Sequence, residues 1–262
     1  MNNETSSADK KKAKKKIYGR SKYWMDFPLA SCPGCGSPLA CKVIMETLEE
    51  LGLVEKAVVV IGVGCAGMAF FFSQIDMAMC AHGPSPSIAA GIKHGNYDDP
   101  IVFTVQGDGD CAAIGAGYLV NSAARSDKIT IFMFNNTNYG TTGGQMAPTT
   151  LIDQVTTTTP EGRDGMTHGY PLHVPEMLAT IKGVAYSARG AVNSFANYRR
   201  TKKFVKSALQ KQVDAVGLSF VEVLTPCPVN WRTEGAETMK WVEERLIAEY
   251  PLGEFKNVDS IE

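Results

Sequence analysis

The chain has 262 residues, of which 44% are hydrophobic and 20% are charged, as expected of a globular protein with one large core. Its formal net charge of −1 at pH 7 excludes a general electrostatic attraction to nucleic acid or to an anionic membrane surface. No stretch approaches the roughly 18 consecutive apolar residues of a membrane-spanning helix, and no apolar segment of the secretory-signal type follows the basic N-terminus. We therefore expect a cytoplasmic protein without a membrane span and without a nucleic-acid partner.

The N-terminal segment differs in composition from the rest of the chain. Residues 10–16 read KKKAKKK, and few apolar residues surround them. We therefore expect residues 1–20 to form a basic flexible tail, with an electrostatic contact to an acidic protein as the alternative. Residues 21–262 are expected to form the folded domain.

The remaining sequence alternates between apolar, β-branched runs and helical patterns. Strands are expected at 57–62, 101–105, 129–134, 185–189 and 218–224. Helices are expected at 38–51, 111–125, 174–181 and 193–212. This alternation predicts an α/β fold, a mostly parallel sheet with helices on both faces. The stretch 140–173 is rich in Gly, Thr and Pro, and a loop of this length indicates a functional segment or one ordered by a partner.

Polar motifs follow the second and third of these strands. The second strand runs into the sequence QGDGD at 106–110 and then into a helix, and the third runs into Asn135 and Asn136. Backbone amides at a helix N-terminus bind phosphate, and the carboxylate of Asp108 suits Mg²⁺. If the two strands are neighbours, the Asn136 amide oxygen reaches the same ion, and Asn138 can add its backbone carbonyl. Either motif alone also occurs in ordinary turns, but the pair predicts a magnesium–diphosphate site.

Seven cysteines in a chain without a secretory signal indicate reduced thiols, used as ligands or in the core. Cys32 and Cys35 form a CPGC motif, whereas Cys65 and Cys227 each follow an expected strand. Four thiolates from three loops would complete a site for [4Fe–4S] or for zinc, although a CxxC motif alone can also be redox-active or structural. The other cysteines lie in helical or apolar contexts and are expected in the core: Cys41, Cys80 and Cys111.

Six motifs occur in a characteristic order: CPGCG, GVGCAG, AHG, GDGD, NNTNYGTTGGQ and TPCP. Along nearly all of residues 22–232 this series resembles the β subunits of 2-oxoacid:ferredoxin oxidoreductases, which carry a thiamine-diphosphate-binding domain of the pyrophosphate-binding (PP) type. The resemblance implies a [4Fe–4S] cluster bound by Cys32, Cys35, Cys65 and Cys227. It implies Mg²⁺ bound by Asp108, Asn136 and the Asn138 carbonyl. The positions that would line thiamine diphosphate are Gly64, Cys65, Ala66, His82, Gly109, Asp110, Gly140 and Thr141, with a hydrogen-bonded core histidine as the alternative for His82.

The resemblance also implies a reaction, the oxidative decarboxylation of a 2-oxoacid to an acyl-CoA with electron transfer through the cluster to ferredoxin. The carboxylate that activates the cofactor is expected on an α subunit, with γ and ferredoxin-like δ subunits in the same complex, so no catalytic residue is assigned to this chain. The segment at 143–163 looks most like members that act on branched-chain 2-oxoisovalerate, with pyruvate and 2-oxoglutarate as alternatives. Pro84 stands where many relatives carry Arg, which bears on the substrate class.

Two other classes of protein share part of the pattern. A zinc-ribbon module could use the same four thiolates, but it would leave the GDG and NN motifs without a role. A dinucleotide-binding protein would use Gly62, Gly64 and Gly67 as its glycine motif. Such a protein also needs an acidic residue about twenty positions further on, at a second strand end, and the sequence offers none there.

Overall fold

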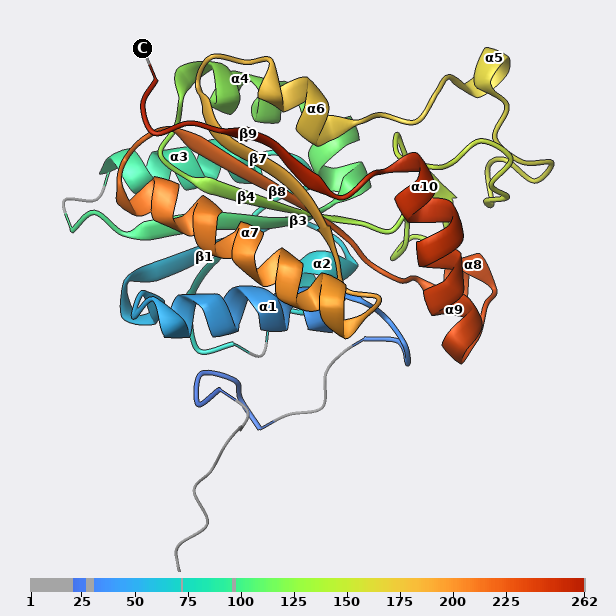
Figure 1. Ribbon diagram of the computed structural model, residues 1–262, viewed down its shortest axis with the longest axis horizontal. Coiled ribbons are helices and arrows are strands. Elements are labelled where there is room, and N and C mark those ends of the chain that lie inside the picture. Colours follow the sequence, from blue (N-terminus) through green and yellow to red (C-terminus); the bar gives the residue numbers. More distant parts are fainter. Residues whose placement is uncertain (1–20, 27–30, 72, 96–97, 262) are drawn as a thin grey trace, which may run out of the picture.

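The computed structural model describes residues 21–26, 31–71, 73–95 and 98–261, so the expected tail at 1–20 lies outside the described residues. Within these ranges, seven strands form one sheet in the order β2-β1-β3-β4-β8-β7-β9 (Figure 1). The strands are β1 Ala57–Ile61, β2 Asp76–Met79, β3 Ile101–Gly107, β4 Thr130–Asn135, β7 Val184–Ala191, β8 Leu218–Leu224 and β9 Gly253–Asn257. All neighbours pair in parallel except β9, which pairs antiparallel with β7. A separate short hairpin joins β5 Asn138–Tyr139 to β6 Gln145–Met146.

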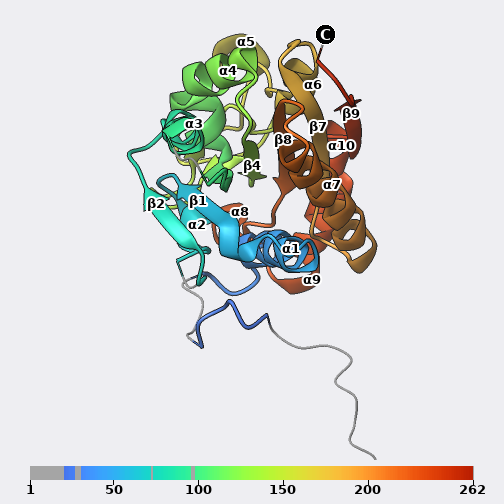
Figure 2. The same ribbon diagram turned by 90° about the vertical axis from the view of Figure 1, so that its left-hand side faces the viewer.

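Helices cover both faces of the sheet, as the sequence predicts (Figure 2). On one face, α1 Ser37–Glu50 and α7 Phe195–Val213 bury apolar side chains against the sheet in a single cluster. On the other face, a second cluster contains residues of α3 Ser85–Gly95, α4 Ala116–Arg125 and α6 Val174–Ala179. The central strands are buried on both sides, which explains their continuous apolar, β-branched sequences.

The remaining helical segments are short. They are α2 Cys65–Met68, α5 Gly165–His168, α8 Pro228–Trp231, α9 Gly235–Trp241, α10 Ile247–Glu249, the 3₁₀ turn Val54–Lys56 and the π-helical turns Asp110–Ile114 and Val242–Leu246. Three of them, α8 to α10, form a helical layer beyond the carboxyl end of β8 (Figure 1). No helix of the described residues has both the length and the apolar character to cross a membrane.

Two strands of the main sheet and one helix boundary are among the differences from the sequence expectations. Strands β2 and β9 were not expected, because β2 reads DMAM without a β-branched residue and β9 reads GEFKN at the exposed edge of the sheet. The helix expected at 111–125 is divided into a π-helical turn and α4 at Gly115. A side chain at Gly115 would lie 2.4 Å from the Asp110 carbonyl oxygen, so the glycine permits a close backbone approach at this division.

The Thr-rich segment at 140–173 is ordered by bonds within this chain. Arg163 is almost completely buried and donates hydrogen bonds to the carbonyl oxygens of Pro148 at 3.0 Å, Gly169 at 2.9 Å and Tyr170 at 2.8 Å. A guanidinium has five N–H donors in a fixed planar arrangement, so one side chain can hold several loop carbonyls at once. Internal hydrogen bonds thus hold this loop together, and the loop extends away from the sheet at α5 (Figure 1).

Candidate functional site

The predicted motifs meet at one edge of the sheet. Strands β3 and β4 are parallel neighbours with Gly107 opposite Phe134, and β4 and β8 are parallel neighbours with Asn135 opposite Leu224. Parallel strands in this register end at the same level, so the loops that follow them lie side by side. The expectation that the GDG and NN motifs follow neighbouring strands is confirmed.

A cavity of about 200 Å³ lies at this edge, and we call it the Asp108 cavity. Every residue predicted to contact Mg²⁺ or thiamine diphosphate lines it: Gly64, Cys65, Ala66, His82, Asp108, Gly109, Asp110, Asn136, Asn138, Gly140 and Thr141. Further lining residues that the sequence did not single out are Ser37, Val63, Tyr139 and Thr142. Val63 lies within GVGCAG, Tyr139 and Thr142 lie within NNTNYGTTGGQ, and Ser37 follows CPGCG, so all four stand in or directly after the motifs although the sequence assigned them no role.

Asp108 is the most strongly perturbed group in the cavity. Its carboxylate is almost fully buried and accepts a hydrogen bond from Thr149 Oγ1. Burial raises the pKa of Asp108 to about 7, because a charged carboxylate loses its hydration there, while hydrogen bonds from Thr149 and from the Gly109 amide act in the opposite direction. A buried carboxylate of this kind is stabilised by a cation, and the Asn136 side chain lines the same cavity. The residues present therefore fit a Mg²⁺ ion.

His82 lies at the side of the same cavity and contacts Asp110. Its Nδ1 atom is 2.9 Å from Asp110 Oδ1, a close contact that lacks good hydrogen-bond alignment. The Gly83 amide donates to the same carboxylate oxygen at 2.6 Å, and Gln106 Nε2 donates to the other at 3.1 Å. The His82 side chain is 28% exposed, so it is part of the cavity wall and not a core histidine.

The position of the Asp110 carboxylate requires a glycine at residue 62, directly after β1. A Cβ atom at Gly62 would lie 1.8 Å from Asp110 Oδ2, so any other residue there would displace the Asp110 side chain. The glycine motif that begins at Gly62 leads into α2, which has only four residues, Cys65–Met68. A dinucleotide-binding fold places a diphosphate at the N-terminus of a full crossover helix, so this segment does not form a site of that kind.

A second cavity of about 380 Å³ contains the four predicted cluster ligands, and we call it the cysteine cavity. It is lined by Cys32, Cys35, Cys65 and Cys227, together with Ser31, Met68, Asn136, Gly140, Thr141, Pro228, Val229 and Asn230. The Cys35 amide donates to the Cys32 carbonyl at 3.0 Å, which closes the CPGC turn. The Gly36 amide donates to the Pro226 carbonyl at 2.9 Å and fixes this turn against the loop that carries Cys227.

The four thiols are arranged around a space and not around a point. Among the described residues, no group of three or more His, Cys, Asp or Glu side chains could hold a single metal ion. Burial raises the pKa of Cys35, and it raises the pKa of Cys227 to about 11, so a cationic metal centre would be needed to hold these thiols as thiolates. Four cysteine thiols that line one cavity are the donor set that a [4Fe–4S] cluster uses, so the residues present fit such a cluster.

The three remaining cysteines lie away from this cavity. Cys41 and Cys111 are completely buried in the two core clusters, in agreement with the sequence expectation. Cys80 is half-buried and packs against the second core cluster from its edge, because it follows the edge strand β2, and its sulfur lies 3.1 Å from Ser85 Oγ. All cysteines in the described ranges are free thiols.

The Asp108 cavity and the cysteine cavity share a wall made of Cys65, Asn136, Gly140 and Thr141. Cys65 Sγ lies 3.0 Å from Thr141 Oγ1, and a Cβ atom at Gly140 would lie 3.3 Å from the same sulfur. A group bound in one cavity would therefore be separated from a group in the other by a single layer of residues.

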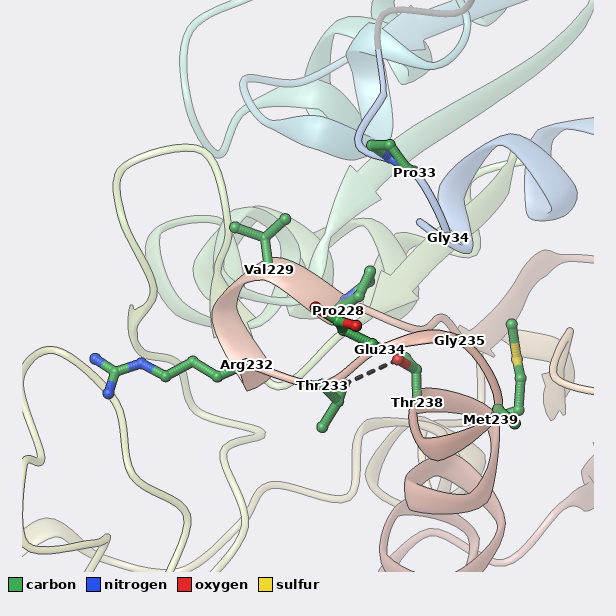
Figure 3. Close-up of a pocket in the computed structure, with 11 residues that line it drawn as sticks. Pro33, Gly34, Pro228, Val229, Arg232, Thr233, Glu234, Gly235, Thr238 and Met239 are labelled. Carbon is green, nitrogen blue, oxygen red and sulfur yellow. Dashed lines mark hydrogen bonds between the residues drawn. The ribbon is translucent and has the colours of Figure 1, made fainter.

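A third cavity, of about 950 Å³, lies on the outer side of the CPGC turn (Figure 3). Pro228 and Val229 of α8 belong to both this cavity and the cysteine cavity. Arg232 projects away from the centre of the cavity, and the Thr233 and Thr238 hydroxyls form a 2.9 Å hydrogen bond at its floor (Figure 3). The sequence did not indicate this cavity, because its walls come from residues 33–34 and 228–239, which share no pattern.

Comparison with known proteins gives consistent results. The family model described as "Thiamine pyrophosphate enzyme, C-terminal TPP binding domain" matches residues 62–223. The 2-oxoglutarate synthase subunit KorB of Methanothermobacter thermautotrophicus is 32% identical over 232 residues, covering 84% of this chain and 74% of that protein. The ketoisovalerate oxidoreductase subunit VorA of Methanothermobacter marburgensis is 41% identical over 229 residues, covering 87% of this chain and 48% of that protein.

A solved structure shows the same fold. It is the 2-oxoglutarate:ferredoxin oxidoreductase from Magnetococcus marinus, with a TM-score of 0.77 and 22% identity over 91% of this chain and 84% of that chain. The chain therefore belongs to the thiamine pyrophosphate enzymes, in the family that contains the subunits of 2-oxoacid oxidoreductases. The α/β fold and the family resemblance predicted from the sequence are confirmed, and the zinc-ribbon alternative is wrong as a description of the fold. The chain spans about half the length of the VorA proteins that it matches.

Proposed function

We propose that this chain is the β subunit of a 2-oxoacid:ferredoxin oxidoreductase and that it binds thiamine diphosphate, Mg²⁺ and one [4Fe–4S] cluster. The observation that carries the proposal is the shared wall between the Asp108 cavity and the cysteine cavity. Oxidative decarboxylation needs a centre that stabilises a carbanion and a nearby acceptor for single electrons, and thiamine diphosphate and the cluster supply these two chemistries when bound. A dinucleotide-binding or purely structural domain would not need the two cavities to be adjacent.

The residues would divide between the two cavities as follows. Asp108, the Asn136 side chain and the Asn138 carbonyl would hold Mg²⁺ against the diphosphate. Thiamine diphosphate would contact Gly64, Cys65, Ala66, His82, Gly109, Asp110, Gly140 and Thr141. The cluster would be bound by Cys32, Cys35, Cys65 and Cys227. Cys65 would thus belong to both groups, with Thr141 holding its sulfur at the boundary.

Other chains would complete the active site. We propose that residues 21–262 form a single cofactor-binding domain and that an α subunit supplies the carboxylate that activates the cofactor. Further γ and δ subunits would supply CoA contacts and ferredoxin-like clusters, and ferredoxin would be the acceptor. The names of the relatives as subunits support a complex. Free cysteines that would serve as ligands support a reducing compartment, for which we propose the cytoplasm.

For the substrate we propose a branched-chain 2-oxoacid similar to 2-oxoisovalerate. The identity to VorA, a ketoisovalerate oxidoreductase subunit, is 41%, against 32% for the KorB protein of Methanothermobacter thermautotrophicus. Pro84 directly precedes α3, and its carbonyl accepts a hydrogen bond from the Ser87 amide at 3.0 Å. Because this residue is a proline, it offers no cationic side chain at a position where many relatives carry Arg. A dicarboxylic substrate such as 2-oxoglutarate would need a positive charge from elsewhere to bind its second carboxylate.

The test is an activity measurement on the chain with and without its partner subunits. Under anaerobic conditions, we expect CoA-dependent reduction of a viologen dye by the complex, fastest with 2-oxoisovalerate, and no turnover by the chain alone after both cofactors have been restored. The expectation follows because thiamine enzymes place the cofactor between two domains, and we propose that this chain supplies one of them. Substantial turnover by the chain alone would contradict the divided active site, and preference for pyruvate or 2-oxoglutarate would contradict the substrate assignment.

A further inference from the structure

The side chain of Asn230 lines the cysteine cavity and is hydrogen-bonded to two residues that line the Asp108 cavity. It lies on α8, and its Nδ2 atom donates to Asn138 Oδ1 at 2.9 Å and to the Gly140 carbonyl at 3.2 Å. The same nitrogen lies 3.6 Å from Cys227 Sγ, within hydrogen-bond distance for sulfur. An amide NH₂ group has two hydrogens, so these three acceptors share them.

The orientation of this amide is fixed by its neighbours. Asn138 Nδ2 donates to the Asn136 carbonyl at 2.7 Å, so the other end of the Asn138 side chain is an acceptor and must face a donor. Asn230 therefore presents its NH₂ group to Asn138. The opposite side of the Asn230 amide lies against Gly144, where a Cβ atom would come within 3.0 Å of Asn230 Oδ1. The Asn230 side chain is thus held on two sides.

The acceptors belong to two different binding sites. Asn138 and Gly140 line the Asp108 cavity and form part of the turn proposed to hold Mg²⁺ and the cofactor. Cys227 lines the cysteine cavity. The next residue on α8 reinforces the link, because Trp231 Nε1 donates to the Asn136 carbonyl at 3.0 Å. Helix α8 therefore connects the loop that carries Cys227 to the turn after β4.

We propose that Asn230 is a positioning residue that couples the cluster to the cofactor site, holding the turn at 138–140 and donating a hydrogen bond to the Cys227 sulfur. This inference rests on the proposed function and assigns a role to a residue outside the predicted ligand sets. A hydrogen bond to a cluster sulfur stabilises the reduced, more negative state and so raises the reduction potential. A partner that orients a metal-binding residue typically contributes about tenfold or more to metal affinity. Asn230 would thereby influence both the reduction potential of the cluster and the affinity for thiamine diphosphate with Mg²⁺.

The test uses the complex purified anaerobically and two substitutions, Asn230→Leu and Asn230→Asp. Leu removes the donor at similar size, and Asp keeps the shape, removes the donor and adds a negative charge. The measurements are the midpoint potential of the cluster, from an EPR-monitored redox titration, and the affinity for thiamine diphosphate with Mg²⁺, from calorimetry. Asn121→Leu is the matched control, since Asn121 is exposed on α4 and its side chain donates to the Gly117 carbonyl of the same helix.

For Asn230→Leu we expect cofactor affinity to fall about tenfold and the potential to become more negative. A tenfold shift of the one-electron equilibrium corresponds to about 59 mV. Asn230→Asp is expected to lower the potential further, because it adds negative charge beside the Cys227 sulfur. The control should change neither property. If both properties stay at wild-type values in variants with normal iron content, or if only one of them changes, the coupling role is wrong.

The wild-type complex separates this inference from the proposed function on which it rests. A wild-type complex that holds no cluster in this chain or does not bind thiamine diphosphate would overturn the proposed function, and the coupling role with it. If one of the two Asn230 variants loses its iron, the reduction potential and the cofactor affinity are measured on the other variant. If both variants lose iron while Asn121→Leu keeps it, Asn230 is needed only to form the cluster site, and the tuning role is refuted.

Discussion

Asp108→Asn is expected to abolish binding of thiamine diphosphate while iron content stays near the wild-type value. The substitution keeps the size of the side chain and removes the negative charge that would bind Mg²⁺ in an almost fully buried position. It also changes the group that accepts the hydrogen bond from Thr149 Oγ1, from a carboxylate to an amide. We expect affinity to fall by at least about a hundredfold, equivalent to roughly 2.7 kcal/mol. Calorimetry with thiamine diphosphate and Mg²⁺ measures the loss.

Asp153→Asn is the matched control for this variant. Asp153 is exposed in the loop at 140–173 and has a φ of 61°, a conformation that Asn adopts readily. The control should bind the cofactor with wild-type affinity. Wild-type affinity for the cofactor in Asp108→Asn would refute the magnesium assignment. A loss of iron in the same variant would show that binding of the cluster depends on binding of the cofactor.

Cys227→Ala is expected to lower iron per chain and the ferredoxin-linked activity, while binding of thiamine diphosphate with Mg²⁺ remains largely intact. The thiol lines the cysteine cavity, and a [4Fe–4S] cluster with three protein thiolates loses the ligand that ties it to the loop after β8. The expected effect differs in kind from that of Asp108→Asn, because the two substitutions act on opposite sides of the shared wall. Iron analysis and the EPR spectrum of the reduced cluster measure it.

Cys41→Ala is the control. Cys41 is a residue of α1 that is completely buried in the first core cluster, and it does not line either cavity. It should keep both the iron and the EPR signal, with at most a modest loss of stability from the smaller side chain. If Cys227→Ala and Cys41→Ala hold the same iron and give the same signal, Cys227 is not a cluster ligand.

The arrangement of the central strands could be predicted from the sequence for a definite physical reason. Strands buried on both faces are typically near-continuous runs of apolar and β-branched residues, and the cores of β1, β3 and β4 follow this pattern, whereas β8 reads LSFVEVL with Ser219 and Glu222 also buried. Their carboxyl ends then meet at one edge, which brings Asp108 near Asn136 without any knowledge of the loops. The edge strands carry no such constraint, and β2 and β9 were missed.

Other parts of the site depend on contacts that no local pattern records. Thr149 reaches Asp108 across 41 positions of the chain, and Asn230 reaches Asn138 across 92. Both side chains come from segments without a periodic pattern, so nothing in the sequence ranked them above their neighbours. The motif residues could be recognised because their chemistry and spacing repeat within a family, whereas these supporting residues are identified only by their hydrogen bonds.

The account depends most directly on two cofactors lying on either side of one wall in this chain. The decisive measurement is a crystal structure of the anaerobically purified complex with thiamine diphosphate and Mg²⁺, with anomalous scattering recorded at the iron edge. We expect iron density among Cys32, Cys35, Cys65 and Cys227, and the diphosphate with its metal ion beside Asp108 and Asn136. A single zinc ion among the four cysteines, or a cofactor bound outside the Asp108 cavity, would contradict the account.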